Sequence, residues 1–299
     1  MSAALKGLIR LAPLLGAALV AACSPQAGGK AGKPLFRAGL DRDALDAAVD
    51  GAFGGAADTC IVVADARSGD ELFTYGSTSV CMRRLPPCAT FEIANALIGL
   101  DAGVVAPTGA MKWDGTPQPI KSWEADADAA AAFKKSIQWW HQKVAEQVGR
   151  DAYVQRFRSF DYGNHDPAGP IGSFWMGPSV GGGLLVSTKE QAAFLARLYA
   201  GRLPVKPGAA AFVQGLMVDE IRKDQTGDYA ISGKTGSCPT QADNSRGVGW
   251  WVGRLKTPSR DLVFAASVEG ANAPPGLVVQ SRLKDAFAQA GLWPKDAGG

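Results

Sequence analysis

The chain has 299 residues, of which 46% are hydrophobic and 20% are charged, a composition typical of globular proteins and too apolar for a disordered chain. Its formal net charge of +3 at pH 7 is too small to indicate a nucleic-acid-binding protein. Only one long apolar run occurs, at the N-terminus, which excludes a multi-pass membrane protein.

The N-terminal segment, residues 1–22, has the pattern of an export signal. Lys6 and Arg10 precede an apolar stretch that is too short to span a bilayer, and small residues follow it. The segment Val-Ala-Ala-Cys23 resembles the bacterial lipobox, in which the cysteine is lipidated and becomes the new N-terminus. We therefore expect residues 1–22 to be a lipoprotein signal peptide and Cys23 to anchor the mature protein to a membrane in the bacterial periplasm. A plain signal peptide with a coincidental cysteine is the alternative.

The rest of the chain divides into two parts. Residues 23–40 are rich in Gly, Pro and Lys, a composition that predicts a flexible tether. Residues 41–299 contain no internal repeat and no second linker, so we expect them to form one folded domain.

Four cysteines remain besides Cys23. They are Cys60, Cys81, Cys88 and Cys238. Export to an oxidising compartment permits disulfides, and four cysteines allow three pairings, among which the sequence does not choose. Free buried thiols are the alternative. The chain has no CxxC pair and only 2 histidines, so we expect no metal site.

Hydrophobic spacing and turn residues predict the elements of the domain. In chain order they are a strand over 59–65, a strand over 71–75 that forms a hairpin with it, a helix over 91–105, a helical stretch over 126–149, a helix over 188–199, strands over 229–234, 247–254 and 261–268, and a helix over about 281–290. Ser187, with Glu190 three residues later, predicts the start of the helix over 188–199. Strands at both ends of the domain with helices between them predict an α/β fold with a central, largely antiparallel sheet flanked by helices.

One chemically suggestive triplet, Lys234-Thr235-Gly236, directly follows a strand-like run. A strand that ends in this way offers a cation, a hydroxyl group and an open backbone edge to an anionic ligand that bears a carbonyl group. The triplet alone is not specific, because a simple turn after a strand is the alternative.

Further short segments accompany the triplet in a fixed order. They are Pro86–Ile93 (PPCATFEI), Lys112–Gly115 (KWDG), Ser136–Gln138 (SIQ), Phe160–Asn164 (FDYGN), Ser173–Trp175 (SFW) and, beyond the triplet, Gly249–Gly253 (GWWVG). In this order and spacing they resemble the class D, or oxacillinase, serine β-lactamases of the penicillin-recognising fold, over about residues 58–294. The resemblance implies a central antiparallel sheet flanked by helices, a helical lobe, and a site between the sheet and the lobe.

The motif that carries this family's catalysis departs from its pattern here. In the family the nucleophile helix begins Ser-Thr-Phe-Lys; the serine attacks the β-lactam carbonyl, and the lysine, carbamylated on its amine, acts as the base. The matching residues here are Ala89-Thr90-Phe91-Glu92. The nucleophile position thus holds a methyl group. The base position holds a carboxylate that ends roughly 3–4 Å short of the usual place, at about 1.3 Å per bond. Hydrolysis by the family's route is therefore not expected.

Three residues near Ala89 are candidate substitute nucleophiles. Cys88 is adjacent, but neighbouring residues on a helix point about 100° apart, so its thiol takes the serine's place only after a shift in register. Thr90 meets the same objection from the other side. Ser136 resembles the second serine of the family's site, which relays protons and does not attack.

The residues that would hold a ligand are mostly present. By the resemblance, Ser136 and the Lys-Thr-Gly triplet (234–236) hold the ligand's carboxylate and flank its carbonyl, and Trp175 packs on the position of the modified lysine. Arg282, which we expect at the start of the last helix, is a looser candidate for the carboxylate-binding arginine. Inherited packing without any ligand is the alternative for all of these residues.

Two hypotheses follow for the function. In the first, the chain is a membrane-tethered, penicillin-recognising pseudoenzyme that binds a β-lactam, a peptidoglycan peptide or a protein partner without efficient turnover, because Ala89 and Glu92 replace the reacting groups. In the second, it is a weak β-lactamase or peptidoglycan hydrolase that works through Cys88 or another group. We prefer the first, and we expect neither a cofactor nor a nucleic-acid partner.

Overall fold

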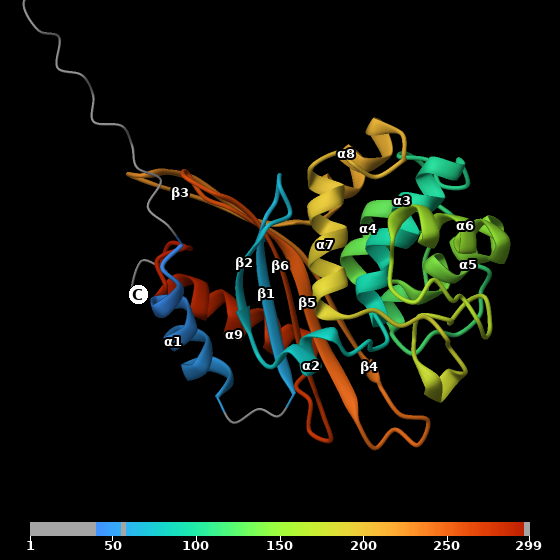
Figure 1. The fold of residues 1–299 in the computed structure, drawn as a ribbon. Coiled ribbons are helices and arrows are strands. Elements are labelled where there is room, and N and C mark those ends of the chain that lie inside the picture. Colours follow the sequence, from blue (N-terminus) through green and yellow to red (C-terminus); the bar gives the residue numbers. More distant parts are fainter. Residues whose placement is uncertain (1–39, 55–57, 296–299) are drawn as a thin grey trace, which may run out of the picture. The chain divides into compact units, whose positions relative to one another are not determined.

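A six-stranded antiparallel sheet, with its strands in the order β2-β1-β6-β5-β4-β3, organises the domain (Figure 1). The computed structural model describes residues 40–54 and 58–295. The strands are β1 (Thr59–Asp65), β2 (Glu71–Tyr75), β3 (Val218–Asp224), β4 (Gly227–Pro239), β5 (Gly247–Lys256) and β6 (Asp261–Gly270). The predicted fold class, an α/β domain with a central antiparallel sheet flanked by helices, is confirmed.

The strands differ from the predicted ones in two respects. β4 continues to Pro239, so the triplet 234–236 lies inside the strand and not at its end. β3 has no counterpart among the predicted elements, because its sequence, Val-Asp-Glu-Ile-Arg-Lys-Asp, is mostly charged. Such a composition is typical of an edge strand, where charges discourage pairing with other chains.

Helices cover both faces of the sheet. They are α1 (Arg42–Phe53), α2 (Thr78–Met82), η1 (Cys88–Phe91), α3 (Glu92–Ala102), η2 (Lys121–Trp123), α4 (Ala129–Lys135), α5 (Gln138–Val148), α6 (Arg150–Phe160), η3 (Pro178–Val180), α7 (Thr188–Tyr199), α8 (Pro207–Leu216) and α9 (Gly276–Gln289). α7 begins as predicted, with both hydrogen bonds of the capping box between Ser187 and Glu190 formed. α9 begins at Gly276, earlier than the predicted start near residue 281.

The helical stretch predicted over 126–149 is two helices, α4 and α5. Ser136 ends α4 in a left-handed backbone conformation with φ 48°, and the Ile137 amide donates to the Ala132 carbonyl oxygen across the turn. The apolar spacing of the sequence continues through this break and therefore hides it. The break directs the Ser136 side chain toward β4.

Two hydrophobic clusters lie on the two faces of the sheet. Alternate side chains of a strand point to opposite faces, so Ile61 and Val63 pack with α1 and α9, whereas Val62 and Ala64 pack with the other helices. In Figure 1, α1 and α9 lie on one side of the sheet, and α3 to α8 lie on the other. The second group is the helical lobe that the resemblance implies.

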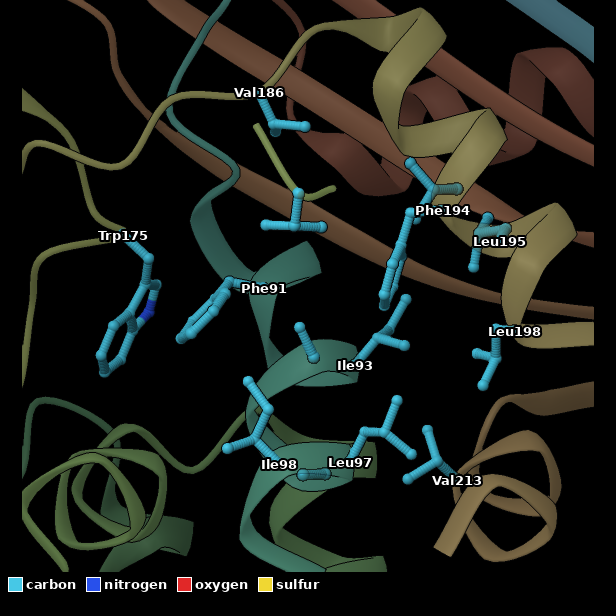
Figure 2. Close-up of a cluster of buried hydrophobic side chains, with 14 of the residues drawn as sticks. Phe91, Ile93, Leu97, Ile98, Trp175, Val186, Phe194, Leu195, Leu198 and Val213 are labelled. Atoms are coloured by element: carbon cyan, nitrogen blue, oxygen red, sulfur yellow. The ribbon is translucent and has the colours of Figure 1, made fainter. Parts of the chain in front are cut away.

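α3 runs through the interior of the lobe. Every residue from Glu92 to Asp101 on this helix is buried. Figure 2 shows Phe91 and the apolar side chains of α3 packed among Trp175 and the side chains of α7. An added Cβ on Gly99 would lie 2.7 Å from the Val144 side chain, so glycine permits the close approach of α5. A polar side chain on the buried part of α3 needs a partner inside the lobe.

The four cysteines form two disulfides, which resolves the pairings that the sequence leaves open. Cys60 on β1 joins Cys81 on α2, with their Cα atoms 5.2 Å apart. Cys88 at the start of η1 joins Cys238 near the end of β4, with their Cα atoms 5.7 Å apart. The alternative of free buried thiols is therefore wrong.

Removing the two disulfides one at a time should destabilise the protein to different degrees. The Cys88–Cys238 bond spans 150 residues and the Cys60–Cys81 bond spans 21. In the chain-entropy model the longer loop contributes about 1.7 kcal/mol more to the free energy of unfolding. We expect Cys88→Ser/Cys238→Ser to lower the urea midpoint more than Cys60→Ser/Cys81→Ser does. Equal midpoints, or the reverse order, would contradict this expectation.

The predicted signal peptide, the lipidation site Cys23 and residues 23–39 of the predicted tether lie outside the described residues, so these assignments stay predictions. The first described helix begins at Arg42, next to the predicted start of the domain. In the part of the chain that the structure describes, no helix is both long and apolar enough to cross a membrane.

Candidate functional site

Lys234 lies at the centre of the candidate site. β4 directs its side chain, which is 8% exposed, toward the helical lobe. Three oxygen atoms surround its ammonium group: Ser136 Oγ at 2.5 Å, Glu92 Oε2 at 3.1 Å and the Thr235 carbonyl oxygen at 3.4 Å. The structure thus brings Ser136 and the triplet together as predicted, and it adds Glu92 to them.

Glu92, at the base position of the family's motif, lies between two nitrogen-bearing side chains. Its side chain is 6% exposed, and Oε2 lies 3.1 Å from Lys234 Nζ and 3.2 Å from His141 Nε2. Burial raises the pKa of this carboxyl group, but His141 and Lys234 beside it outweigh burial and hold the pKa below its ordinary value. Glu92 is therefore ionised in the folded protein, and its carboxylate forms an ion pair with Lys234.

The Glu92 carboxylate should make folding stability depend on pH. Because its pKa is lower in the folded protein than in the unfolded chain, its stabilisation is fully present above about pH 4.5 and is lost as the pH falls through the folded-state pKa. Urea unfolding of the wild type and of Glu92→Gln, between about pH 7 and pH 3, measures the effect. The difference in free energy of unfolding between the two proteins should shrink as the pH falls. A difference that stays constant would contradict the assignment.

His141 is held in place by Asn95 and Tyr153, all three of them buried. Asn95 Nδ2 lies 3.2 Å from His141 Nδ1 and donates to the His141 carbonyl oxygen at 3.1 Å. The Tyr153 hydroxyl donates to Asn95 Oδ1, which leaves the amide nitrogen to face the imidazole. Asn95 thus contacts both Nδ1 and the carbonyl oxygen of His141, while Nε2 on the other side of the ring lies 3.2 Å from Glu92 Oε2. A buried polar chain thus leads from α6 to Glu92.

The position of the family's nucleophile is filled by the methyl group of Ala89, which is half-buried in η1. Thr90 does not replace the missing hydroxyl, because it is 1% exposed. Its hydroxyl donates to the Pro87 carbonyl oxygen at 2.6 Å and accepts from Gln191 Nε2 at 2.7 Å. Both hydrogen bonds fix Thr90 as part of the packing between η1 and α7.

The hypothesis that Cys88 is a substitute nucleophile is wrong for this structure. Its sulfur is bonded to Cys238, whereas nucleophilic attack requires a thiolate. Ser136 keeps its hydroxyl, and the Lys234 ammonium, which is paired with Glu92, donates to Ser136 Oγ. An ammonium has no lone pair with which to accept a proton, so Lys234 does not act as a base for Ser136 in this arrangement.

The backbone edge of β4 beside Ser136 and Lys234 is open. Gly233 N–H donates to the Met217 carbonyl oxygen at 2.8 Å, on the side of β4 away from β5, and pairing with β3 reaches only Ser232. Alternate residues of a strand direct their backbone groups the same way, so Thr235 and Ser237 present theirs on this side. Within residues 40–54 and 58–295 no strand pairs with β4 there.

Gly236 and Trp175 shape the surroundings of Ala89. An added Cβ on Gly236 would lie 3.1 Å from the Ala89 nitrogen and 3.0 Å from the Thr90 nitrogen, so glycine lets β4 approach η1. Trp175 is 2% exposed, and its ring centroid lies 5.1 Å from that of Phe91 (Figure 2). The tryptophan therefore packs on the residue that precedes the base position.

The structure does not bring Arg282 to the other site residues. It lies in the middle of α9 and not at its start, and its side chain is exposed. The neighbouring Leu283 packs into the hydrophobic cluster shared with α1, on the face of the sheet opposite Lys234. The prediction that Arg282 begins the last helix is wrong, because α9 extends back to Gly276.

A separate cavity of about 350 Å³ is lined in part by Leu85, Pro86 and Thr240. Its lining includes three arginines, and each is paired. Arg83 and Arg246 both contact Glu269, which is 4% exposed, and Arg84 binds Glu190 through two nitrogens. Glu269 on β6 thus joins Arg83 and Arg246, the residue before β5, in one ion-pair network, and the separate Arg84–Glu190 pair leads to α7. Among the described residues, no group of three or more His, Cys, Asp or Glu is arranged to hold a metal ion.

The sequence analysis missed His141, Asn95 and Tyr153. One signal was present: Glu92 and Asn95 are three residues apart on a helix and therefore share a face. An asparagine within an apolar helix also needs a partner. Nothing in the sequence linked this face to His141, because α5 reaches it only through tertiary packing.

Comparison with known proteins identifies the family. Residues 59–288 match the family model of the penicillin binding protein transpeptidase domain. The β-lactamase OXA-48 of Klebsiella pneumoniae is 35% identical over 209 residues, which cover 70% of this chain and 75% of that protein. The chain belongs to the class D β-lactamase-like family. The solved structure of the class D β-lactamase BAT-2 is similar in fold, with a TM-score of 0.71 and 28% sequence identity. The match covers 83% of this chain and 97% of the BAT-2 chain.

The class D-like chain is also similar to a regulatory protein. BlaR1 of Bacillus licheniformis is 28% identical over 228 residues, which cover 76% of this chain and 36% of BlaR1. The C-terminal domain of the Bacillus licheniformis BlaR penicillin-receptor shares the fold, with a TM-score of 0.69 and 24% identity over 79% of this chain and 92% of that domain. The class D-like fold therefore occurs both in β-lactamases and in a penicillin receptor.

Proposed function

We propose that this chain is a penicillin-recognising lipoprotein of the bacterial periplasm that binds β-lactams or peptidoglycan peptides without efficient turnover. One observation carries the proposal: Ala89 stands where the family has its serine, Cys88 is held in a disulfide, and Thr90 is buried with its hydroxyl group hydrogen-bonded. Removing the nucleophile of a serine hydrolase costs on the order of 10⁶ in turnover, so binding is the activity that remains.

The binding apparatus supports the same conclusion. Ser136 and Lys234 are held together by a hydrogen bond, and Thr235 and Ser237 lie on the open edge of β4. A backbone edge of this kind receives a ligand that bears amide groups, in the manner of an added strand. Similarity to a penicillin receptor as well as to β-lactamases is consistent with recognition that is separate from hydrolysis.

The cellular location rests on the N-terminal sequence. The signal-like segment 1–22 and the lipobox-like residues before Cys23 support export and attachment to a membrane. The disulfides Cys60–Cys81 and Cys88–Cys238 are consistent with an oxidising compartment.

A pair of variants at one position tests whether the β4 edge binds ligand. Ser237→Pro removes the backbone N–H from the edge, whereas Ser237→Ala keeps it, and both lose the hydroxyl that accepts from Gly276 N–H. Calorimetric titration with benzylpenicillin and with an acetylated D-Ala-D-Ala peptide measures affinity. We expect binding to the wild type and to Ser237→Ala, and a loss of roughly tenfold or more in Ser237→Pro. If neither probe binds the wild type, Ser136 and the triplet 234–236 have only a packing role inherited from the family, and the proposal fails.

A further inference from the structure

We propose that Glu92 determines the ligand class of this site: it occupies Lys234 in place of a ligand's carboxylate, so the site accepts extended peptide or amide ligands without favouring a free carboxylate at this end. The inference rests on the proposed function, because it concerns the ligand of the same site. It reverses the prediction, drawn from the resemblance, that Lys234 holds a ligand's carboxylate.

The hydrogen-bonding capacity of Lys234 is the first argument. An ammonium group has three N–H donors and no acceptor. Lys234 Nζ already has Ser136 Oγ at 2.5 Å, Glu92 Oε2 at 3.1 Å and the Thr235 carbonyl oxygen at 3.4 Å. Ser136 Oγ and the Thr235 carbonyl oxygen accept hydrogen bonds from this ammonium group, and Glu92 is its ion-pair partner. A carboxylate ligand must therefore compete with Glu92 for Lys234.

The charge around Lys234 is the second argument. Glu92 is ionised and neutralises the ammonium group at 3.1 Å, in surroundings where both side chains are less than a tenth exposed. A ligand carboxylate that approaches this pair meets one positive and one negative charge, so the attraction to the first is cancelled by repulsion from the second. Moving Glu92 away would leave its charge buried with only His141 beside it, which is costly.

No other buried cation replaces Lys234 in the described part of the site. Lys134 and Lys135, on the last turn of α4, are exposed, so water and salt screen their charges. Arg282 is exposed on α9. Of the two cations that the resemblance offers for binding a carboxylate, Lys234 is therefore neutralised by Glu92, and Arg282 is absent from the site.

The groups that remain are neutral. Ser136 accepts from Lys234 and still has its own hydroxyl proton to donate. Ser237 is exposed, and its N–H and C=O groups lie on the open edge of β4. Neutral donors and acceptors at strand spacing match the backbone of an extended peptide, which pairs with a sheet edge through its amides. The occupant that fits this edge is a peptide segment whose end near Lys234 is an amide or a continuing chain.

Two pairs of probes test the inference on the wild-type protein. Each pair differs only in the carboxylate: an acetylated D-Ala-D-Ala peptide against its C-terminal amide, and benzylpenicillin against its methyl ester. A free lysine would favour the acid of each pair by roughly ten- to hundredfold in Kd. We expect the acid and the neutral form to bind within about threefold of each other, or the neutral form to bind more tightly. An acid that binds tenfold more tightly than its neutral form would overturn the inference while leaving the proposed function intact.

A variant tests the role of Glu92 directly. Glu92→Gln removes the competing charge, so we expect the acid of each pair to gain roughly tenfold over its neutral form. Glu146→Gln, the same chemical change at an exposed position on α5, is the matched control and should leave the ratio unchanged. A folded Glu92→Gln with an unaltered ratio would contradict the assignment. If neither form of either probe binds the wild type, the proposed function itself fails, and the inference with it.

Discussion

Ala89→Ser together with Glu92→Lys should convert this protein into one that is acylated by penicillins. The double substitution rebuilds the Ser-Thr-Phe-Lys motif that the family uses, on a helix whose surroundings are already in place. Because the loss of a serine nucleophile costs on the order of 10⁶ in rate, we expect the acylation rate to rise by several orders of magnitude. Intact-protein mass after incubation with benzylpenicillin, in the presence of bicarbonate for lysine carbamylation, measures the adduct.

The single variant Ala89→Ser is the control for this gain. It supplies a hydroxyl but no base, because Glu92 is held by Lys234 and His141 at 3.1 and 3.2 Å. We expect it to acylate far more slowly than the double variant. Equal rates in the two would show that Glu92 serves as a base after all. A folded double variant that forms no adduct would show that the site has lost more than its two reacting groups.

Glu92→Gln should be among the most destabilising single substitutions in the protein. It leaves the Lys234 ammonium, 8% exposed, without its carboxylate partner. Breaking a buried pair by removing one partner typically costs about 3–5 kcal/mol in free energy of unfolding, because the remaining charge stays buried and uncompensated. Urea unfolding at neutral pH measures this loss.

The matched comparison is Glu146→Gln, which removes the same charge from an exposed position on α5. Surface substitutions of this kind change stability by about 0.5 kcal/mol or less. A loss below about 1 kcal/mol for Glu92→Gln would contradict the strong buried ion pair on which the description of the site rests.

Much of the fold was predictable, because local patterns and tertiary structure agree there. The β1–β2 hairpin follows from its β-branched run and turn, and α7 follows from its capping box. β3 was missed because packing at the edge of a sheet, and not an apolar pattern, makes its charged segment a strand. The break at Ser136 was missed because a single left-handed residue leaves no mark on hydrophobic spacing.

The site was predictable only in part. The meeting of Ser136 with Lys234 followed from the family's motifs, and the structure places them 2.5 Å apart. The reach argument predicts that the Glu92 carboxylate ends short of the family's base position, and this stays a prediction. It did not reveal what the carboxylate would do instead, because that depends on two distant segments, β4 and α5, packing against α3.

The two departures from the family's motif have different consequences. Ala89 removes a reacting atom and changes little else around it. Glu92 places a carboxylate oxygen 3.1 Å from Lys234 Nζ, and this charge pairs with the buried ammonium group without any modification. This ion pair, together with the absence of a nucleophile at position 89, fits the binding function without turnover that we propose.

The most direct test of this account is the intact mass of the wild-type protein after incubation with a panel of penicillins and carbapenems, with the drugs assayed in the same samples. The account predicts an unchanged protein mass and intact drug. A stable acyl adduct, or hydrolysed drug in excess of a protein-free control, would show that a substitute nucleophile exists, and peptide mapping of the adduct would locate it.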